Sequence, residues 1–148
     1  MAASESPVNI RVAAMNLLAR REHSRLELER KLERRFGDHA LVHEQLDRLA
    51  AEHLQSDSRY AESLLRQRID RGHGPVRIHR EMRQNGLSTA IISAALEQEA
   101  PDWQGLAAET YRRKFGDLPP HDIAEKARRS RFMQYRGFES EHYRHLID

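Results

Sequence analysis

Apolar residues recur along this chain at the spacing of short amphipathic helices. Ile10, Ala13 and Leu17 form the first such stripe and predict a helix over about residues 8–21. Alternation of β-branched residues never persists for five positions. The one Asn-Gly pair, at 85–86, ends a helical pattern instead of joining two strands. The chain is therefore predicted to be all-α.

Capping residues divide the pattern that follows into further helices. Ser24 and Glu27 have the spacing of a capping box, so a second helix should begin there and end at Gly37. Asp38 can cap a third helix, which is expected to end around residues 53–55. These signals predict three short helices in the first third of the chain.

The hydrophobic pattern repeats at intervals of about 50 residues. A shift of 50 carries Leu28 onto Ile78, and a similar shift reaches a third, looser copy after residue 101. In that copy Pro119-Pro120 is predicted to open a helix whose apolar stripe includes Ile123. The positions expected to form the core of the first two copies are Leu28, Leu32, Val42, Leu46, Ile78, Met82, Ile92 and Leu96.

The repeats predict the organisation of the whole chain. We expect a disordered N-terminus at residues 1–7 and three-helix repeats over residues 8–55, 56–100 and 101–148. Units of this size are close to the limit at which one core is stable alone, so neighbours should pack against each other. The predicted fold is three tandem three-helix repeats in an elongated, curved, solenoid-like chain, which we expect to be a monomer.

Charged residues make up 32% of the chain but nearly cancel, with 25 Lys and Arg against 23 Asp and Glu. Electrostatic recognition must therefore come from local patches. The absence of cysteine excludes disulfides and thiolate metal sites and fits a reducing compartment. The N-terminus lacks the features of a secretion signal, and no apolar run approaches the length of a membrane span. We expect a cytoplasmic protein with no membrane contact.

Two stretches carry an excess of basic residues. The first, residues 66–87, bends at a Gly-His-Gly-Pro corner (72–75), and its later arginines fall opposite the apolar stripe. The second, residues 126–136, holds no acidic residue and interleaves Phe132 and Tyr135, which could stack on unpaired bases. We favour a core position for Phe132 and leave Tyr135 open. The predicted partner- or nucleic-acid-binding residues are Arg66, Arg68, Arg71, Arg77, Arg80, Arg83, Lys126, Arg128, Arg129, Arg131 and Arg136.

Other chemistries find little support. No nucleophile elbow, Gly-rich phosphate loop or paired-carboxylate motif occurs, so we predict neither enzymatic activity nor a cofactor. His39 and His43 have the i, i+4 spacing of a metal clamp, but no third ligand is evident, and we interpret them as exposed helix residues. Sequence-specific DNA binding by a helix-turn-helix is not favoured, because the third helices carry residues such as Thr89 and Ser93 instead of base-reading Asn, Gln and Arg.

Four motifs occur in a particular order. They are Arg-Arg-Glu-His-Ser with the Glu-Leu and Lys-Leu after it (21–32), Ser-Asp-Ser-Arg-Tyr-Ala (56–61), Arg-Gly-His-Gly-Pro-Val-Arg-Ile (71–78) and Arg-Phe-Met-Gln-Tyr-Arg-Gly-Phe (131–138). Together they span nearly the whole chain, which resembles the RecX family of bacterial regulators of the RecA recombinase. The third motif is the most specific. Among the departures from the family pattern, His53 stands where glycine is common.

This resemblance implies a chain that lodges in the groove of the RecA–DNA filament and inhibits recombinase, ATPase and coprotease activities. It places the protein in the regulation of recombination, DNA repair and the SOS response, with weak, non-specific DNA binding. The alternative is a general nucleic-acid-binding helical protein that meets recombinase only through shared DNA. Capping, groove insertion and filament disassembly remain alternative mechanisms, and the sequence does not assign one repeat to protein and another to DNA.

Overall fold

Nine helices and no strand make up residues 6–148, which are the residues that the computed structural model describes. The prediction of an all-α chain is confirmed. The helices are α1 (Pro7–Arg20), α2 (Arg25–Phe36), α3 (His39–Ala51), α4 (Asp57–Asp70), α5 (Pro75–Gln84), α6 (Thr89–Glu99), α7 (Trp103–Phe115), α8 (Ile123–Tyr135) and α9 (Ser140–Ile147). None of these nine is both long enough and apolar enough to cross a membrane.

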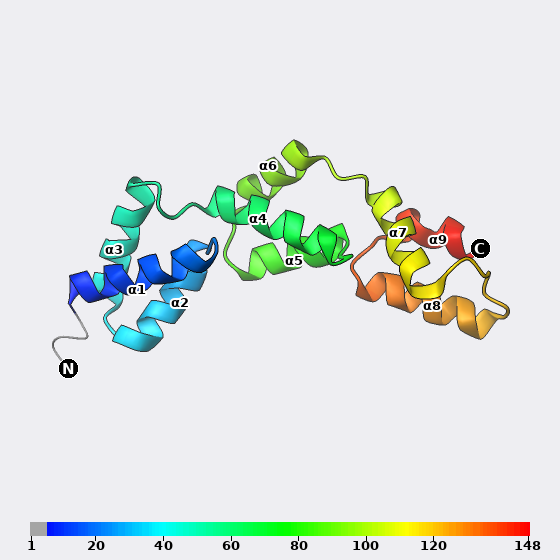
Figure 1. Cartoon of the computed structure of the whole chain (residues 1–148), viewed down its shortest axis with the longest axis horizontal. Coiled ribbons are helices and arrows are strands. Elements are labelled where there is room, and N and C mark those ends of the chain that lie inside the picture. Colours follow the sequence, from blue (N-terminus) through cyan, green and yellow to red (C-terminus); the bar gives the residue numbers. More distant parts are fainter. Residues whose placement is uncertain (1–5) are drawn as a thin grey trace.

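Consecutive helices pack in threes, each group around its own hydrophobic cluster. Leu28 lies in the cluster of α1–α3, Ile78 in that of α4–α6, and Met133 in that of α7–α9. Trp103 packs against both the second and the third cluster. Figure 1 shows the three groups side by side in an elongated, arched row, as predicted. The repeat boundaries at residues 55/56 and 100/101 remain a proposal, which limited proteolysis of the intact chain can test.

The predicted core positions lie inside the protein, with one partial exception. Seven of the eight are no more than 1% exposed, and Leu96 is half-buried against the second cluster. The prediction for Ile123 is wrong, since its side chain is 85% exposed. The Pro119-Pro120 pair precedes α8 without opening it. Instead Asp122 caps the helix by accepting from the Glu125 N–H at 2.8 Å, which leaves Ile123 in a first turn that faces solvent.

Two other boundaries differ from the prediction. The segment 1–7, predicted to be disordered, lies outside the described residues except for Ser6 and Pro7. For those two the prediction is wrong: the Ser6 hydroxyl accepts from the Val8 N–H at 3.2 Å, and Pro7 begins α1. At the other end of this group α3 stops at Ala51, and His53 takes a left-handed φ of 61°.

Hydrogen bonds join each helix group to the next. Between the first two groups, the Arg25 N–H donates to the Asp57 carboxylate at 2.9 Å, where α2 begins beside the start of α4. Between the second and third groups, the Gly74 N–H donates to the Arg136 carbonyl at 2.7 Å, and the Val76 N–H donates to the Gly137 carbonyl at 2.9 Å. The second joint brings the start of α5 against the turn between α8 and α9.

Candidate interaction surface

A groove of about 670 Å³ lies where the second helix group meets the third. Its walls come from the end of α4, from α5 and from the last turn of α8, so two distant parts of the sequence line one hollow. We call it the central groove. Its principal side chains are Arg68, Arg71, His73, Arg77, Arg80 and Tyr135.

Glycine and proline shape one wall of the central groove. Gly72 follows the end of α4 with a left-handed φ of 79°, a conformation that costs little without a Cβ. Gly74 is the N-cap of α5, and Pro75 occupies its first turn. The chain therefore turns sharply between two arginine-bearing helices, which places Arg71 near Arg77.

Arg68 is neutralised within the groove. Its Nε and Nη2 atoms donate to the two oxygens of Glu81 at 2.7 and 2.6 Å, a fork geometry that favours both charged forms. These hydrogen bonds raise the pKa of Arg68 and lower the pKa of Glu81. Arg68 therefore supports the wall of the groove more than it adds positive charge.

Three other arginines supply the positive charge of the groove. Arg71 and Arg80 are exposed and Arg77 is half-buried, and none of them forms an ion pair with a described residue. The Arg77 guanidinium lies 5.0 Å from the ring centroid of Tyr135, which is 72% exposed. Tyr135 is thus a surface residue in a cation–π contact. Phe132, in contrast, packs against the third cluster, as favoured from the sequence.

His73 lies among these arginines as a neutral side chain. Burial, followed by repulsion from Arg77, Arg68 and Arg136, lowers the pKa of His73 to about 4. Its Nδ1 atom is buried and makes no hydrogen bond to a described residue. At neutral pH His73 therefore leaves the charge of the groove to the arginines.

A second, smaller basic hollow of about 260 Å³ adjoins the first and shares Arg71. Arg136 lines it, donates to the Arg71 carbonyl at 2.9 Å and lies 5.1 Å from the ring centroid of Phe132. Arg113 and Lys114 complete it. Sequence reasoning missed these two residues, although the basic run 112–114 at the end of α7 was a signal for them.

The predicted basic run of α8 divides into exposed and buried members. Lys126, Arg128 and Arg131 are exposed. Arg129 is only 4% exposed and donates to the Tyr111 hydroxyl at 2.7 Å, the Leu118 carbonyl at 2.9 Å and a Glu125 oxygen at 2.9 Å. Its assignment to a binding surface is therefore wrong, because its long side chain turns inward and ties the loop before α8 to α7.

The remaining predicted arginines lie outside the central groove. Arg66 is exposed on α4, within 3.8 Å of Glu62, and Arg83 is exposed on α5, where it donates to the Thr89 hydroxyl at 3.1 Å. The structure thus brings Arg68, Arg71, Arg77 and Arg80 together and leaves these two on neighbouring surfaces.

A basic corner in the first helix group has a different electrostatic character. Arg21 pairs with Glu27 at 3.1 Å, and Arg25 pairs with Glu29 at 3.1 Å. Its charges are compensated locally, whereas those of the central groove are available to an outside anion. A groove of this kind can bind phosphates or acidic side chains.

Comparison with known proteins gives the family. The second three-helix domain of RecX matches residues 56–96, and the third three-helix domain of RecX matches residues 102–147. The chain is 46% identical to the regulatory protein RecX of Pseudomonas putida (strain GB-1) over 134 residues, which cover 90% of this chain and 86% of that protein. It is 48% identical, over the same shares of the two chains, to the regulatory protein RecX of Pseudomonas savastanoi pv. phaseolicola.

Solved structures have the same fold. A crystal structure of regulatory protein RecX superposes with a TM-score of 0.75 at 23% identity, covering 93% of this chain and 70% of that one. The crystal structure of RecX from Lactobacillus salivarius gives a TM-score of 0.73 at 22% identity, covering 92% of this chain and 90% of that one. The sequence relatives and the two matched domains show that this chain belongs to the RecX family of regulatory proteins.

Proposed function

We propose that this protein binds the RecA–DNA filament and inhibits its recombinase, ATPase and coprotease activities, with the central groove as the principal contact. The observation that carries the proposal is the set of Arg71, Arg77 and Arg80, which line one groove and form no ion pair with a described residue. Relatives at nearly half identity are named regulatory proteins, which agrees with a regulatory role.

The position of the groove suits a long, polyanionic or acidic partner. It lies where the second group of an arched row of helix groups meets the third (Figure 1), so a filament that contacts it could also contact the flanking groups. Desolvated arginines discriminate strongly between acidic and basic partners, because like charges held together cost several kcal/mol. We infer that the groove contributes both affinity and orientation on the filament.

We further propose a monomeric binding protein that acts without catalysis in the cytoplasm and serves recombination, DNA repair and the SOS response. Contact with bare DNA should be weak and non-specific, since exposed arginines that meet phosphates carry no sequence information. Static light scattering of the full chain at micromolar concentration tests the monomer, and a mass near 17.3 kDa is expected.

A general nucleic-acid-binding role is the second candidate. The exposed Tyr135 ring, flanked by Arg77, favours it, because single-stranded bases stack on such rings beside basic grooves. In this role inhibition of recombinase would follow only from coverage of the DNA.

A titration separates the two candidates. The protein is added at one salt concentration to RecA filaments and to bare single- and double-stranded DNA, with ATP hydrolysis and DNA occupancy followed in parallel. The proposal expects inhibition at protein concentrations well below those that coat bare DNA. Inhibition that follows DNA coverage at every concentration would support the second candidate instead.

A further inference from the structure

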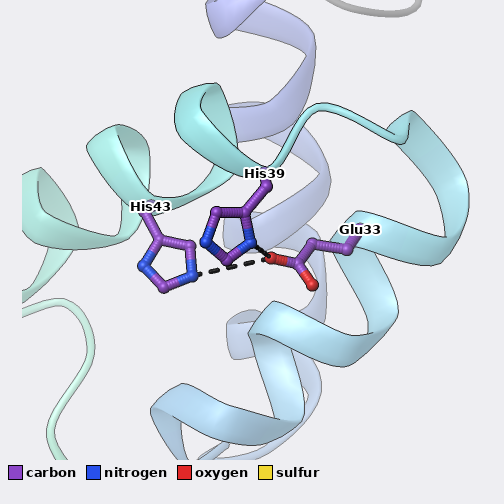
Figure 2. A group of neighbouring side chains, drawn as sticks. All are labelled: Glu33, His39 and His43. Atoms are coloured by element: carbon purple, nitrogen blue, oxygen red, sulfur yellow. Dashed lines mark hydrogen bonds and ion pairs between the residues drawn. The ribbon is translucent and has the colours of Figure 1, made fainter.

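Three potential metal ligands converge between α2 and α3, far from the central groove. Figure 2 shows Glu33 of α2 pointing towards the imidazoles of His39 and His43 of α3. The Nδ1 atom of His39 is in direct contact with Glu33 Oε1, and His43 Nε2 lies 3.5 Å from the same oxygen. The two rings lie side by side, with centroids 4.1 Å apart.

The turn between the two helices creates this arrangement. Gly37 ends α2 with a left-handed φ of 76°, and Asp38 immediately caps α3. The first turns of α3 therefore fold back on the last turns of α2. The sequence showed the i, i+4 histidine pair without a third ligand, and that interpretation needs correction, because Glu33 reaches the pair from the preceding helix.

The distance between His43 and Glu33 suits a divalent transition metal. With metal–ligand bonds of about 2.0–2.2 Å, donor atoms in a tetrahedral site lie about 3.3–3.6 Å apart. The 3.5 Å between His43 Nε2 and Glu33 Oε1 falls in that range, and each pair among the three donor atoms lies within 4.8 Å. His39 Nδ1 lies closer to the Glu33 oxygen than two ligands of one ion do, but its ring is exposed and can turn to admit the ion.

His43 gives a second, independent indication of a ligand. Its Nε2 atom is buried from solvent yet forms no hydrogen bond to a described residue. Glu29 also lies 3.6 Å from this nitrogen and is itself held by Arg25 at 3.1 Å. Two carboxylates thus face this ring nitrogen, an environment that a cation would stabilise.

We propose that Glu33, His39 and His43 bind one divalent transition-metal ion of the zinc class, with water as the fourth ligand. Two imidazoles and one carboxylate select such ions over magnesium, which prefers oxygen ligands. The bound ion joins α2 to α3 and stabilises the first helix group, because it binds the folded arrangement and not the extended chain. This proposal is independent of the proposed regulatory function.

Two other clusters of acidic and histidine side chains provide a comparison. His121, Asp122 and Glu125 come together at the start of α8, but only one imidazole is present there, and Glu125 is engaged by Arg129 at 2.9 Å. The cluster of Glu139, Glu141 and His142 also has a single imidazole. His121 is therefore a suitable control position.

Isothermal titration of the full chain with Zn²⁺, and separately with Mg²⁺, tests the proposal. We expect one Zn²⁺ per chain, no measurable Mg²⁺ binding, and a melting temperature that rises with Zn²⁺. His39→Ala, His43→Ala and Glu33→Gln should each weaken Zn²⁺ binding at least about tenfold, while His121→Ala should not. The absorption spectrum of the Co²⁺ form should show intense tetrahedral bands that are lost in the two histidine variants.

His39 is exposed, so His39→Ala should remain folded in the absence of metal, which circular dichroism can verify. A loss of Zn²⁺ binding in this variant is then a loss of a ligand and not of the fold. Zn²⁺ affinity and stoichiometry that are unchanged in both histidine variants would overturn the proposal. It would also be overturned if the wild-type chain bound no Zn²⁺ at about 100 micromolar free metal, roughly the weakest range for a useful site.

Discussion

Gly74 and Gly137 meet backbone to backbone at the joint between the second and third helix groups. A Cβ on Gly74 would lie 2.5 Å from the Gly137 carbonyl oxygen, and a Cβ on Gly137 would lie 2.7 Å from the backbone nitrogen of Arg77. Neither position can carry a side chain unless the two groups move apart. The Gly-x-Gly-Pro motif therefore shapes the central groove in two ways. It forms the sharp turn between α4 and α5, and it allows this close contact with Gly137.

Gly74→Ala should disturb the joint. The backbone φ of Gly74 is −92°, which alanine tolerates, so the expected effect is steric and not conformational. We expect a loss of about 1–3 kcal/mol in the free energy of unfolding, typical of overpacking, together with a changed small-angle scattering profile. Denaturant unfolding and scattering of the full chain measure both.

Gly116→Ala is the control for that variant, because its effect should be conformational and not steric. Gly116 has a left-handed φ of 72°, and nothing lies within 4 Å of the position that a Cβ would take there. Its ψ of −154° places it in a region that is essentially restricted to glycine, so the variant should lose about 1–3 kcal/mol through backbone strain, with no change in scattering. Equal scattering profiles for wild type and Gly74→Ala would show that the joint does not depend on the contact between Gly74 and Gly137.

Local pattern was sufficient to predict the helices and most of the core. Leu28 and Ile78 are buried because their helices present one apolar face, a property that spacing along the chain determines. Capping at Ser24 was equally predictable, since the box involves residues three apart. Gly86 ends its helical pattern with a φ of 82° for the same local reason.

Features that depend on tertiary contacts were not predictable from one sequence. The inward turn of Arg129 depends on the Tyr111 hydroxyl, which belongs to another helix. The third side chain at the histidine pair, Glu33, comes from the preceding helix, and Lys114 reaches the smaller basic hollow only through the packing of α7 on α8. Charge runs indicated where basic residues occur, but not which of them face solvent.

Arg129→Met should weaken the fold and not the binding surface. The substitution keeps much of the side-chain volume but leaves the Tyr111 hydroxyl and the Leu118 carbonyl without their donor. We expect a clearly lower melting temperature, with DNA affinity unchanged at temperatures where the variant is folded. The comparison variant is Arg131→Met at an exposed position, which should keep its melting temperature and bind DNA more weakly. Thermal unfolding and DNA titration of both variants test the assignment.

His53→Gly should stabilise the protein. His53 has a φ of 61° at the end of the first helix group, and this left-handed conformation raises the free energy of the folded state for any residue with a Cβ. After allowance for the greater entropy of glycine in the unfolded chain, the gain should be about 0.5–1 kcal/mol. Ala94→Gly, at an exposed position inside α6, should lose a similar amount, and denaturant unfolding distinguishes the two signs.

Stability should fall on mild acidification because of His73. Its folded-state pKa is about 4 against 6.5 for an ordinary histidine, so the unfolded chain takes up the proton first. The contribution of neutral His73 to the free energy of unfolding is therefore fully present above pH 6.5 and is lost progressively as the pH falls towards 4. Unfolding free energies measured at intervals between neutral pH and the folded-state pKa should show this decline.

His73→Gln should reduce the slope of that decline without abolishing it. Burial also lowers the pKa of His23, which continues to contribute in the same direction. Glu81, whose pKa the hydrogen bonds from Arg68 lower, acts mainly below pH 4.5 and so outside most of this window. An identical slope in wild type and variant would mean that His73 is not held neutral in the folded protein.

Reversal of the unpaired charges in the central groove should abolish filament inhibition. We expect the triple variant Arg71→Glu, Arg77→Glu, Arg80→Glu to keep its helicity and most of its thermal stability, because none of these side chains forms an ion pair with a described residue. Repulsion should raise the protein concentration for half-inhibition of ATP hydrolysis by at least about tenfold, a cost of about 1.4 kcal/mol.

The control is Arg20→Glu, Arg34→Glu, Arg35→Glu, which changes the same number of exposed charges in the first helix group. Where the groove binds phosphates, the log–log salt slope should fall by about one for each phosphate that the variant no longer binds. If the groove variant inhibits at the wild-type concentration while the control does not, the filament contact lies in the first helix group and the central groove is only a solvated surface.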